Sequence, residues 1–156
     1  MKLDSSVLDI WVFRRAGPEV QYLLLHTSQL KADRYFNGGR FWQIPSDFVR
    51  DGEKVVEALE RTLGKFAVAS AALWAAEHCY TIYNRRFESM QIIAVYAAEA
   101  RPGEVRLDPE EHSEARWCSF DQALSLLTYR GLKDGLRSTR EYITGPAEPA
   151  RELRLG

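Results

Sequence analysis

The chain has 156 residues, of which 46% are hydrophobic and 28% are charged, as expected for one globular domain. Its 21 Lys and Arg against 22 Asp and Glu give a net charge of −1, which argues against general nucleic-acid binding through excess positive charge. The longest apolar stretch, residues 66–76, is about half as long as the roughly 20 residues that a membrane-spanning helix needs. We therefore expect no membrane insertion.

The start of the chain and its cysteines bear on cellular location. Residues 1–6 have no long apolar core after their single lysine, so they do not resemble a secretory signal peptide. The two cysteines, Cys79 and Cys118, are too few for a disulfide framework. We therefore expect a protein of the reducing cytoplasm.

The first part of the chain predicts three strands. Residues 7–13 are β-branched and aromatic, and residues 20–26 form a second apolar run that we expect to pair with the first. Residues 27–40 are polar and end in Asn-Gly-Gly, which indicates a loop. Residues 41–44 predict a short strand, which Pro45 ends.

A helix and two long strands follow. Apolar residues recur at spacings of three and four over residues 55–66, which is the period of an amphipathic helix. Asp51 is placed to cap its first turn. Strands are predicted over about 73–82 and 89–98, and residues 83–86 form a hairpin loop between them.

The last part of the chain predicts a short strand and two helical stretches. The strand covers residues 115–118. Ser119 and Gln122 then match a capping box, in which the Ser oxygen accepts a hydrogen bond from the third helical N–H and the Gln side chain reaches back. A helix to Leu127 follows, and a second helical stretch runs from about residue 132 to residue 143.

The C-terminal segment and the order of elements define the domain. Residues 145–156 contain two prolines and mixed charges, so we expect a flexible tail after a single domain of residues 1–144. Strands, a helix, strands and helices in this order predict an α+β fold with a mixed sheet.

One segment carries a motif with specific spacing. Trp42 and Pro45 precede Gly52-Glu53, and Glu57-Ala58, Arg61 and Leu63 follow in register without a gap. These residues resemble the box of the Nudix hydrolase family. That pattern has a Trp-x-x-Pro-Gly-Gly strand end, then Gly, five residues, Glu, seven residues and Arg-Glu-apolar-x-Glu-Glu-x-Gly. Residues 110–117 resemble the later Glu-containing loop and Trp strand of the family.

The resemblance implies both a fold and a chemistry. The fold would be a Nudix-type α/β/α sandwich with a mixed central β-sheet, in which the box forms a loop, a helix and a loop. The chemistry would be that of nucleoside diphosphate-X pyrophosphohydrolases, whose box glutamates hold divalent cations against a diphosphate. Such cations are coordinated by several oxygen ligands, and they polarise the phosphoryl group and activate water.

The sequence departs from the family pattern at the acidic positions. The three glutamates that follow Arg61 in the family are replaced by Thr62, Lys65 and Phe66. The Gly-Gly pair becomes Ser46-Asp47. A hydroxyl, an ammonium and a phenyl group cannot replace three carboxylates as ligands of a hard cation. We therefore expect the usual metal site to be lost or severely weakened, with no cofactor unless the protein is active with Mg²⁺ or Mn²⁺.

The remaining box residues are Gly52, Glu53, Glu57 and Arg61. By helical geometry, Glu57 and Arg61 are four residues apart and most simply form a surface ion pair. If any metal binds, Glu53 and Glu57 are the candidate ligands. The resemblance makes Glu53, together with Glu111 of the late loop, the candidate catalytic residues. The alternatives are a first-turn acid at a helix N-terminus for Glu53 and a solvated acidic turn for the late loop.

Loop arginines supply the candidate ligand contacts. Arg34, Arg40 and Arg85 carry the bidentate donors that bind phosphate, and Tyr83 is placed to stack on a base. Loop arginines are also commonly only exposed to solvent.

Three functional hypotheses remain open from the sequence. The first is a domain derived from nucleotide pyrophosphohydrolases, with catalysis impaired or lost and binding of a nucleotide or nucleoside diphosphate derivative retained. The second is an active Mg²⁺- or Mn²⁺-dependent pyrophosphohydrolase that uses Glu53 and the late-loop acids. The third is a protein-interaction module, which would form a homodimer or bind another protein without a small ligand.

Overall fold

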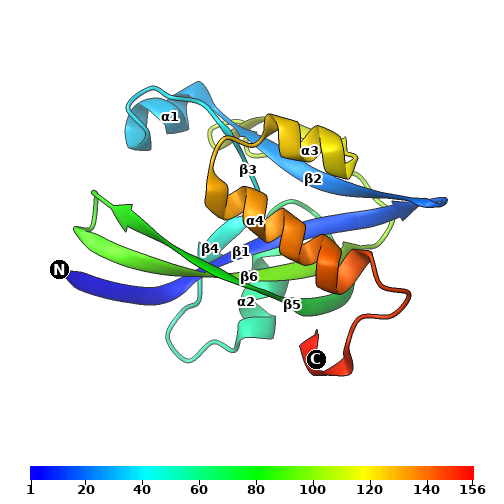
Figure 1. Ribbon diagram of the computed structural model, residues 1–156. Helices are drawn as coiled ribbons and strands as arrows, with labels where there is room; N and C mark the ends of the chain where they lie inside the picture. Colours follow the sequence, from blue (N-terminus) through cyan, green and yellow to red (C-terminus); the bar gives the residue numbers. More distant parts are fainter.

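The computed structural model describes all 156 residues and contains one eight-stranded sheet with helices on both faces (Figure 1). The main strand order is β3-β2-β1-β6-β5-β8, while β4 pairs with β1 and β7 pairs with β2. The strands are β1 (Lys2–Ala16), β2 (Glu19–Thr27), β3 (Trp42–Gln43), β4 (Ser46–Phe48), β5 (Ser70–Asn84), β6 (Ser89–Ala100), β7 (His112–Cys118) and β8 (Arg154–Leu155).

Strand β1 lies at the centre of this sheet and makes it mixed. It runs antiparallel to β2 and β4 but parallel to β6. Its side chains alternate between two hydrophobic cores, as strand geometry requires. Leu8, Ile10 and Val12 belong to the core on the side of helix α2, whereas Trp11 and Phe13 belong to the core on the side of helices α3 and α4. The expected α/β/α sandwich of the α+β class is confirmed.

The four α-helices are α1 (Gln29–Tyr35), α2 (Val55–Gly64), α3 (Phe120–Leu126) and α4 (Arg130–Thr139). None of them is long and apolar enough to cross a membrane. The predicted helix of the box is confirmed as α2, but the expected cap is wrong. The N-cap residue is Lys54 rather than Asp51. The Lys54 backbone N–H donates to the Glu57 carboxylate at 2.8 Å, so an acid in the first turn satisfies the helix terminus.

Helix α1 lies inside the segment predicted to be a loop. Ser28 caps it, since its hydroxyl accepts a hydrogen bond from the Lys31 backbone N–H at 3.0 Å. Ala32 is the only buried residue of the helix. An amphipathic helix is recognised in a sequence by its apolar stripe, and this helix has none.

The capping box before α3 is confirmed. The Ser119 hydroxyl accepts a hydrogen bond from the Gln122 N–H at 3.2 Å, and the Ser119 N–H donates to the Gln122 side chain at 3.0 Å. The second predicted helical stretch corresponds to α4 and a following π-helical turn, Arg140–Thr144. Helix α4 packs across β5 and β1, so it closes one face of the sheet (Figure 1).

The C-terminal segment, residues 145–156, returns to the sheet. A 3-10 turn, Arg151–Leu153, leads into β8, which pairs antiparallel with β5. Leu153 packs against one hydrophobic core and Leu155 against the other. The sequence predicts a flexible tail here, and the structure gives the segment partners that a flexible tail would lack.

Replacing both Leu153 and Leu155 with Ala therefore tests the role of this segment. Because the two side chains are partly buried, we expect the free energy of unfolding to fall by about 1–3 kcal/mol. Urea titration measures this change, with Glu152→Ala as an exposed control. An unchanged midpoint in the double variant would support the flexible tail instead.

Candidate functional site

The loop before α2 is held by an ion pair between Glu53 and Arg61. The Arg61 guanidinium donates to both carboxylate oxygens of Glu53, each at 2.8 Å. The Arg50 backbone N–H adds a third hydrogen bond at 3.0 Å. These bonds from Arg61 and Arg50 lower the pKa of Glu53 to about 2. Only 13% of the Glu53 side chain is exposed. Both of its carboxylate oxygens accept hydrogen bonds from protein donors.

Asp47 joins the same cluster, which we call the box ion cluster (Asp47, Glu53, Arg61 and Lys65). Arg61 donates to Asp47 at 3.0 Å and to the Phe48 carbonyl at 2.7 Å. Lys65 forms a second ion pair with Asp47. Burial raises the pKa of Asp47, but the hydrogen bond from Lys65 and the nearby positive charges outweigh it and leave the pKa below its ordinary value.

The predicted surface pair between Glu57 and Arg61 is wrong. Glu57 instead accepts from the Lys54 N–H, while the side-chain partners of Arg61 are Asp47 of β4 and Glu53 of the loop before α2. The sequence spacing is compatible with both pairings. The second pairing forms because β4 and the loop that follows it together offer two carboxylates and a carbonyl to one guanidinium. Gly52, the fourth box residue, adopts a positive φ of 76°, which glycine accommodates without strain.

The box helix does not fit a divalent cation. Thr62 is fully buried, and its hydroxyl donates to the Ala58 carbonyl at 2.7 Å. Phe66 packs in the core and contacts the ring of His112. No three His, Cys, Asp or Glu side chains are grouped to hold a metal ion. The two carboxylates on this side, Asp47 and Glu53, are already neutralised by Arg61 and Lys65.

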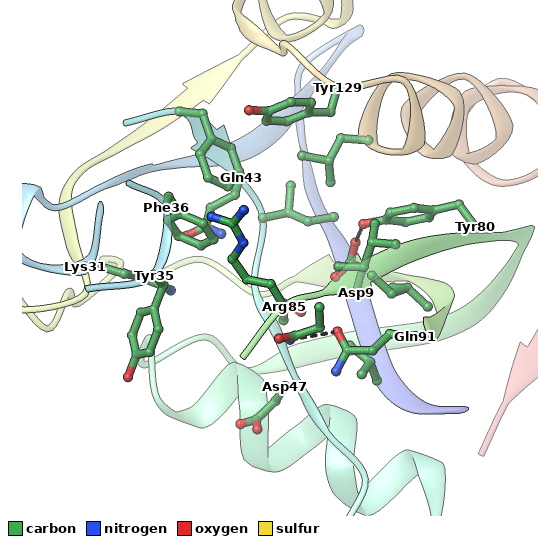
Figure 2. Close-up of a pocket in the computed structure, with 18 of the residues that line it drawn as sticks. Asp9, Lys31, Tyr35, Phe36, Gln43, Asp47, Tyr80, Arg85, Gln91 and Tyr129 are labelled. Atoms are coloured by element: carbon green, nitrogen blue, oxygen red, sulfur yellow. Dashed lines mark hydrogen bonds between the residues drawn. The ribbon is translucent and has the colours of Figure 1, made fainter. Parts of the chain in front are cut away.

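A cleft of about 610 Å³ opens beside the box loop, within the size range of small-molecule sites (Figure 2). Its walls come from β1, α1, the segment from α1 through β4, β5, β6 and the start of α4. Three aromatic rings, Phe36, Phe41 and Tyr129, meet edge to face along one side, with centroid distances of 4.9 and 5.2 Å. We call this cleft the inner pocket.

Asp9 is a buried carboxylate of the inner pocket. It is 3% exposed and lies on the central strand β1. The Tyr80 hydroxyl donates to one of its oxygens (Figure 2). Burial raises the pKa of Asp9 to about 6, although the hydrogen bond from Tyr80 opposes the shift. Asp9 is the only acid in the apolar run 7–13, a signal that could have identified it from the sequence.

Gln43 also lines the inner pocket, and a hydrogen bond with His112 orients its side chain. The His112 Nε2 atom lies 2.9 Å from the Gln43 side-chain oxygen. Burial lowers the pKa of His112 to about 4, so the ring is neutral at pH 7. The other ring nitrogen is buried without a partner. An unpaired acceptor is tolerated better than an unpaired N–H donor, so we assign the proton to Nε2, which then donates to Gln43.

A second cleft of about 780 Å³ shares several residues with the inner pocket, among them Tyr35, Phe48 and Arg85. We call it the outer cleft. It contains the predicted ligand residues Arg34, Arg85 and Tyr83 together with Arg86, and no Asp or Glu lines it. The guanidinium groups of Arg34 and Arg86 lie over the Tyr35 ring, at 5.9 and 5.0 Å from its centroid.

Two other predicted site residues lie outside both clefts. Arg40 is used within the fold, since it donates to the Thr27 carbonyl at 2.9 Å and to the Ser113 hydroxyl. Glu111 forms an ion pair of 3.0 Å with Lys31 of α1. The structure therefore brings Arg34, Tyr83 and Arg85 together in the outer cleft. Arg40 and Glu111 line neither cleft, and Asp47 is the one member of the box ion cluster that borders the inner pocket.

The sequence pattern of the NUDIX domain matches residues 5–138, and the chain therefore belongs to the Nudix hydrolase family. Among curated proteins, no sequence matches this chain significantly.

Solved Nudix structures share the fold at low sequence identity. A putative NUDIX hydrolase from Listeria monocytogenes is 19% identical with a TM-score of 0.74, over 94% of this chain and 99% of that chain. The MutT protein from Methanosarcina mazei is 21% identical with a TM-score of 0.70, over 90% and 96%. The NUDIX domain of Shewanella oneidensis NrtR, solved with ADP ribose, is 17% identical with a TM-score of 0.67, over 90% and 89%.

Replacing Arg61 with Met should destabilise the protein. The change leaves Asp47 and Glu53 without their shared donor, and we expect a loss of about 1–3 kcal/mol in the free energy of unfolding. Lys65→Met is the matched control, because Lys65 is half exposed and its ion pair is worth less than about 1 kcal/mol. Equal losses in both variants would contradict the central position of Arg61.

Replacing Asp9 with Asn should change stability in a pH-dependent way. The raised pKa of Asp9 means that the folded state binds a proton more tightly than the unfolded state, so the stability from protonation is lost as the pH rises through about 6. Asn carries no charge and can still accept from Tyr80. The measured quantity is the free energy of unfolding of the variant minus that of the wild type. We expect this difference to be larger at pH 8 than at pH 4, by on the order of 1–3 kcal/mol.

Thermal unfolding at both pH values measures this difference. Asp51→Asn, a change at an exposed loop position, is the control and should give the same difference at both pH values. A constant difference for Asp9→Asn would mean that Asp9 is not held in an unfavourable charged state.

Proposed function

We propose that this Nudix-family chain is a nucleotide-binding domain that takes a nucleoside diphosphate derivative without a metal ion at its box, and that its hydrolytic activity is lost or strongly reduced. The observation that carries the proposal is the joined pair of clefts, aromatic on the inside and rich in arginine on the outside. The box ion cluster supports the second part, because its carboxylates are already paired.

The two clefts fit the two halves of a nucleotide. The aromatic wall of the inner pocket suits a flat heterocyclic base, since aromatic rings stack on or pack against its faces. Arg85 lies where the pockets meet, and Arg34 and Arg86 extend the positive charge outward. Guanidinium groups bind phosphate through paired, charge-assisted hydrogen bonds. A diphosphate would thus be bound by side-chain cations.

The relatives supply a compatible ligand class. The NrtR NUDIX domain is solved with ADP ribose, and a Caenorhabditis elegans relative of this fold is an Ap4A hydrolase. Both compounds contain a base joined to a chain of phosphates. We infer the same general class of ligand here, because both halves of such a molecule have a matching surface in the joined clefts.

Calorimetry with ADP, GDP and ADP-ribose in the presence of EDTA tests metal-independent binding. We expect saturable binding to the wild-type chain and about tenfold weaker binding to a double variant, Arg34→Gln with Arg85→Gln, because two phosphate contacts are lost. Arg151→Gln, the same substitution on the C-terminal turn outside both clefts, is the control and should leave binding unchanged.

A hydrolysis assay with Mg²⁺ or Mn²⁺ supplies the opposing outcome. Nucleoside triphosphates, dinucleoside polyphosphates and nucleotide sugars serve as substrates, and release of phosphate or pyrophosphate is measured. Robust turnover that Glu53→Gln abolishes would overturn the proposal in favour of an active pyrophosphohydrolase. Absence of any nucleotide binding would overturn it in favour of an interaction module.

A further inference from the structure

The inner pocket contains a buried carboxylate that the box chemistry does not use. Asp9 lies on the central strand of the sheet, and no Lys, Arg or His is a hydrogen-bond or ion-pair partner of it. Taking a carboxylate out of water is unfavourable unless hydrogen-bond donors replace the water. The Tyr80 hydroxyl supplies one such donor, and a carboxylate can accept several more.

Gln43 offers the complementary group in the same pocket. Because His112 donates to the Gln43 carbonyl oxygen, the Gln43 amide is fixed in orientation, and its NH₂ group is left to donate to another partner. In Figure 2, Gln43 lies on the side of the cavity with Phe36 and Arg85, whereas Asp9 lies with Tyr80 on the opposite side. The pocket therefore combines an acceptor, Asp9, with a donor, Gln43, and aromatic walls.

We propose that Asp9 determines base specificity in this pocket, by accepting hydrogen bonds from a heterocycle edge with adjacent N–H donors, so that guanine nucleotides are preferred over adenine nucleotides. The guanine edge carries a ring N–H beside an exocyclic NH₂, and both can donate to one carboxylate. Its carbonyl oxygen is the acceptor for which the Gln43 amide is suited. Adenine presents an unprotonated ring nitrogen in place of the ring N–H, which a carboxylate repels.

This inference rests on the proposed nucleotide binding and adds the identity of the base. Its direct test is calorimetry with GDP, IDP and ADP at pH 8 in EDTA. IDP keeps the ring N–H and the carbonyl oxygen of GDP but lacks the exocyclic amine. We expect affinities in the order GDP, IDP, ADP, with GDP bound about tenfold or more tightly than ADP.

Two variants separate the roles of the polar groups. Asp9→Asn places an NH₂ group where the carboxylate stood, so it should strongly reduce the preference for GDP over ADP. Gln43→Leu should weaken GDP and IDP more than ADP, because only the first two carry the carbonyl oxygen. Asp51→Asn is the matched control and should keep the wild-type order. Thermal unfolding verifies that each variant is folded. If Asp9→Asn does not fold, Gln43→Leu still tests the base preference.

The ratio of GDP to ADP affinity gives a second readout when the pH is lowered to 5. Protonation of Asp9 removes its charge and turns one oxygen into a donor, so the ratio should fall in the wild type but stay constant in Asp9→Asn. Lys31, Asp47 and Arg85 are the other charged residues of the pocket, and Tyr80 and Ser46 face Asp9 directly. Taking the ratio cancels the phosphate protonation that both nucleotides share.

The outcomes distinguish the two proposals. Equal affinity for GDP and ADP in the wild type, or an unchanged ratio in Asp9→Asn, would overturn the role of Asp9 while leaving nucleotide binding intact. Absence of binding by all three nucleotides would overturn both the base specificity and the proposed function.

Discussion

The guanidinium of Arg61 is the interaction on which the box region depends. It bonds Glu53, Asp47 and the Phe48 carbonyl at once, and so it connects helix α2 to strand β4 and to the loop between them. Two carboxylates close together repel each other unless a cation lies between them. In this chain Arg61 and Lys65 supply that positive charge. The box keeps its shape through side-chain ion pairs, and its carboxylates are engaged with protein donors.

The residues that build the fold of this chain are different from the glutamates that carry the metal chemistry in the family pattern. The Nudix sandwich is built by apolar alternation along β1 and by the apolar face of α2, and neither depends on the missing glutamates. Thr62 and Phe66, which stand where the family pattern has acids, are both buried in this fold. The inner pocket includes Ser46, Asp47 and Phe48 of the box segment, but its other walls come from elements outside the box, so the cleft does not depend on a bound cation.

Much of the fold could be predicted from the sequence because its signals are local. The strand runs, the period of α2 and the capping box at Ser119 each lie within a short segment. Helix α1 could not be predicted, since only Ala32 is buried and no apolar stripe marks it. The partners of Arg61 could not be predicted either, because Glu57 and Glu53 are both within its reach and only the folded loop decides between them.

The candidate site was predicted less completely than the fold. Arg34, Tyr83 and Arg85 share one cleft, although Arg34 lies on α1 and Tyr83 at the end of β5 instead of in loops. Arg40 bonds the backbone of β2 and belongs to the fold. Gln43 and His112 are far apart in sequence and meet only because β3 and β7 both pair with β2. Long-range strand pairing of this kind leaves no pattern in a single sequence.

Paramagnetic broadening of backbone amide signals by Mn²⁺ tests the central claim most directly. The ion broadens the NMR signals of residues near any site that it occupies. If Arg61 and Lys65 neutralise the box carboxylates, the amide signals of residues 47–53 and 61–66 should broaden no more than those of other surface segments at millimolar Mn²⁺. Selective broadening of those two segments at micromolar Mn²⁺ would contradict the account.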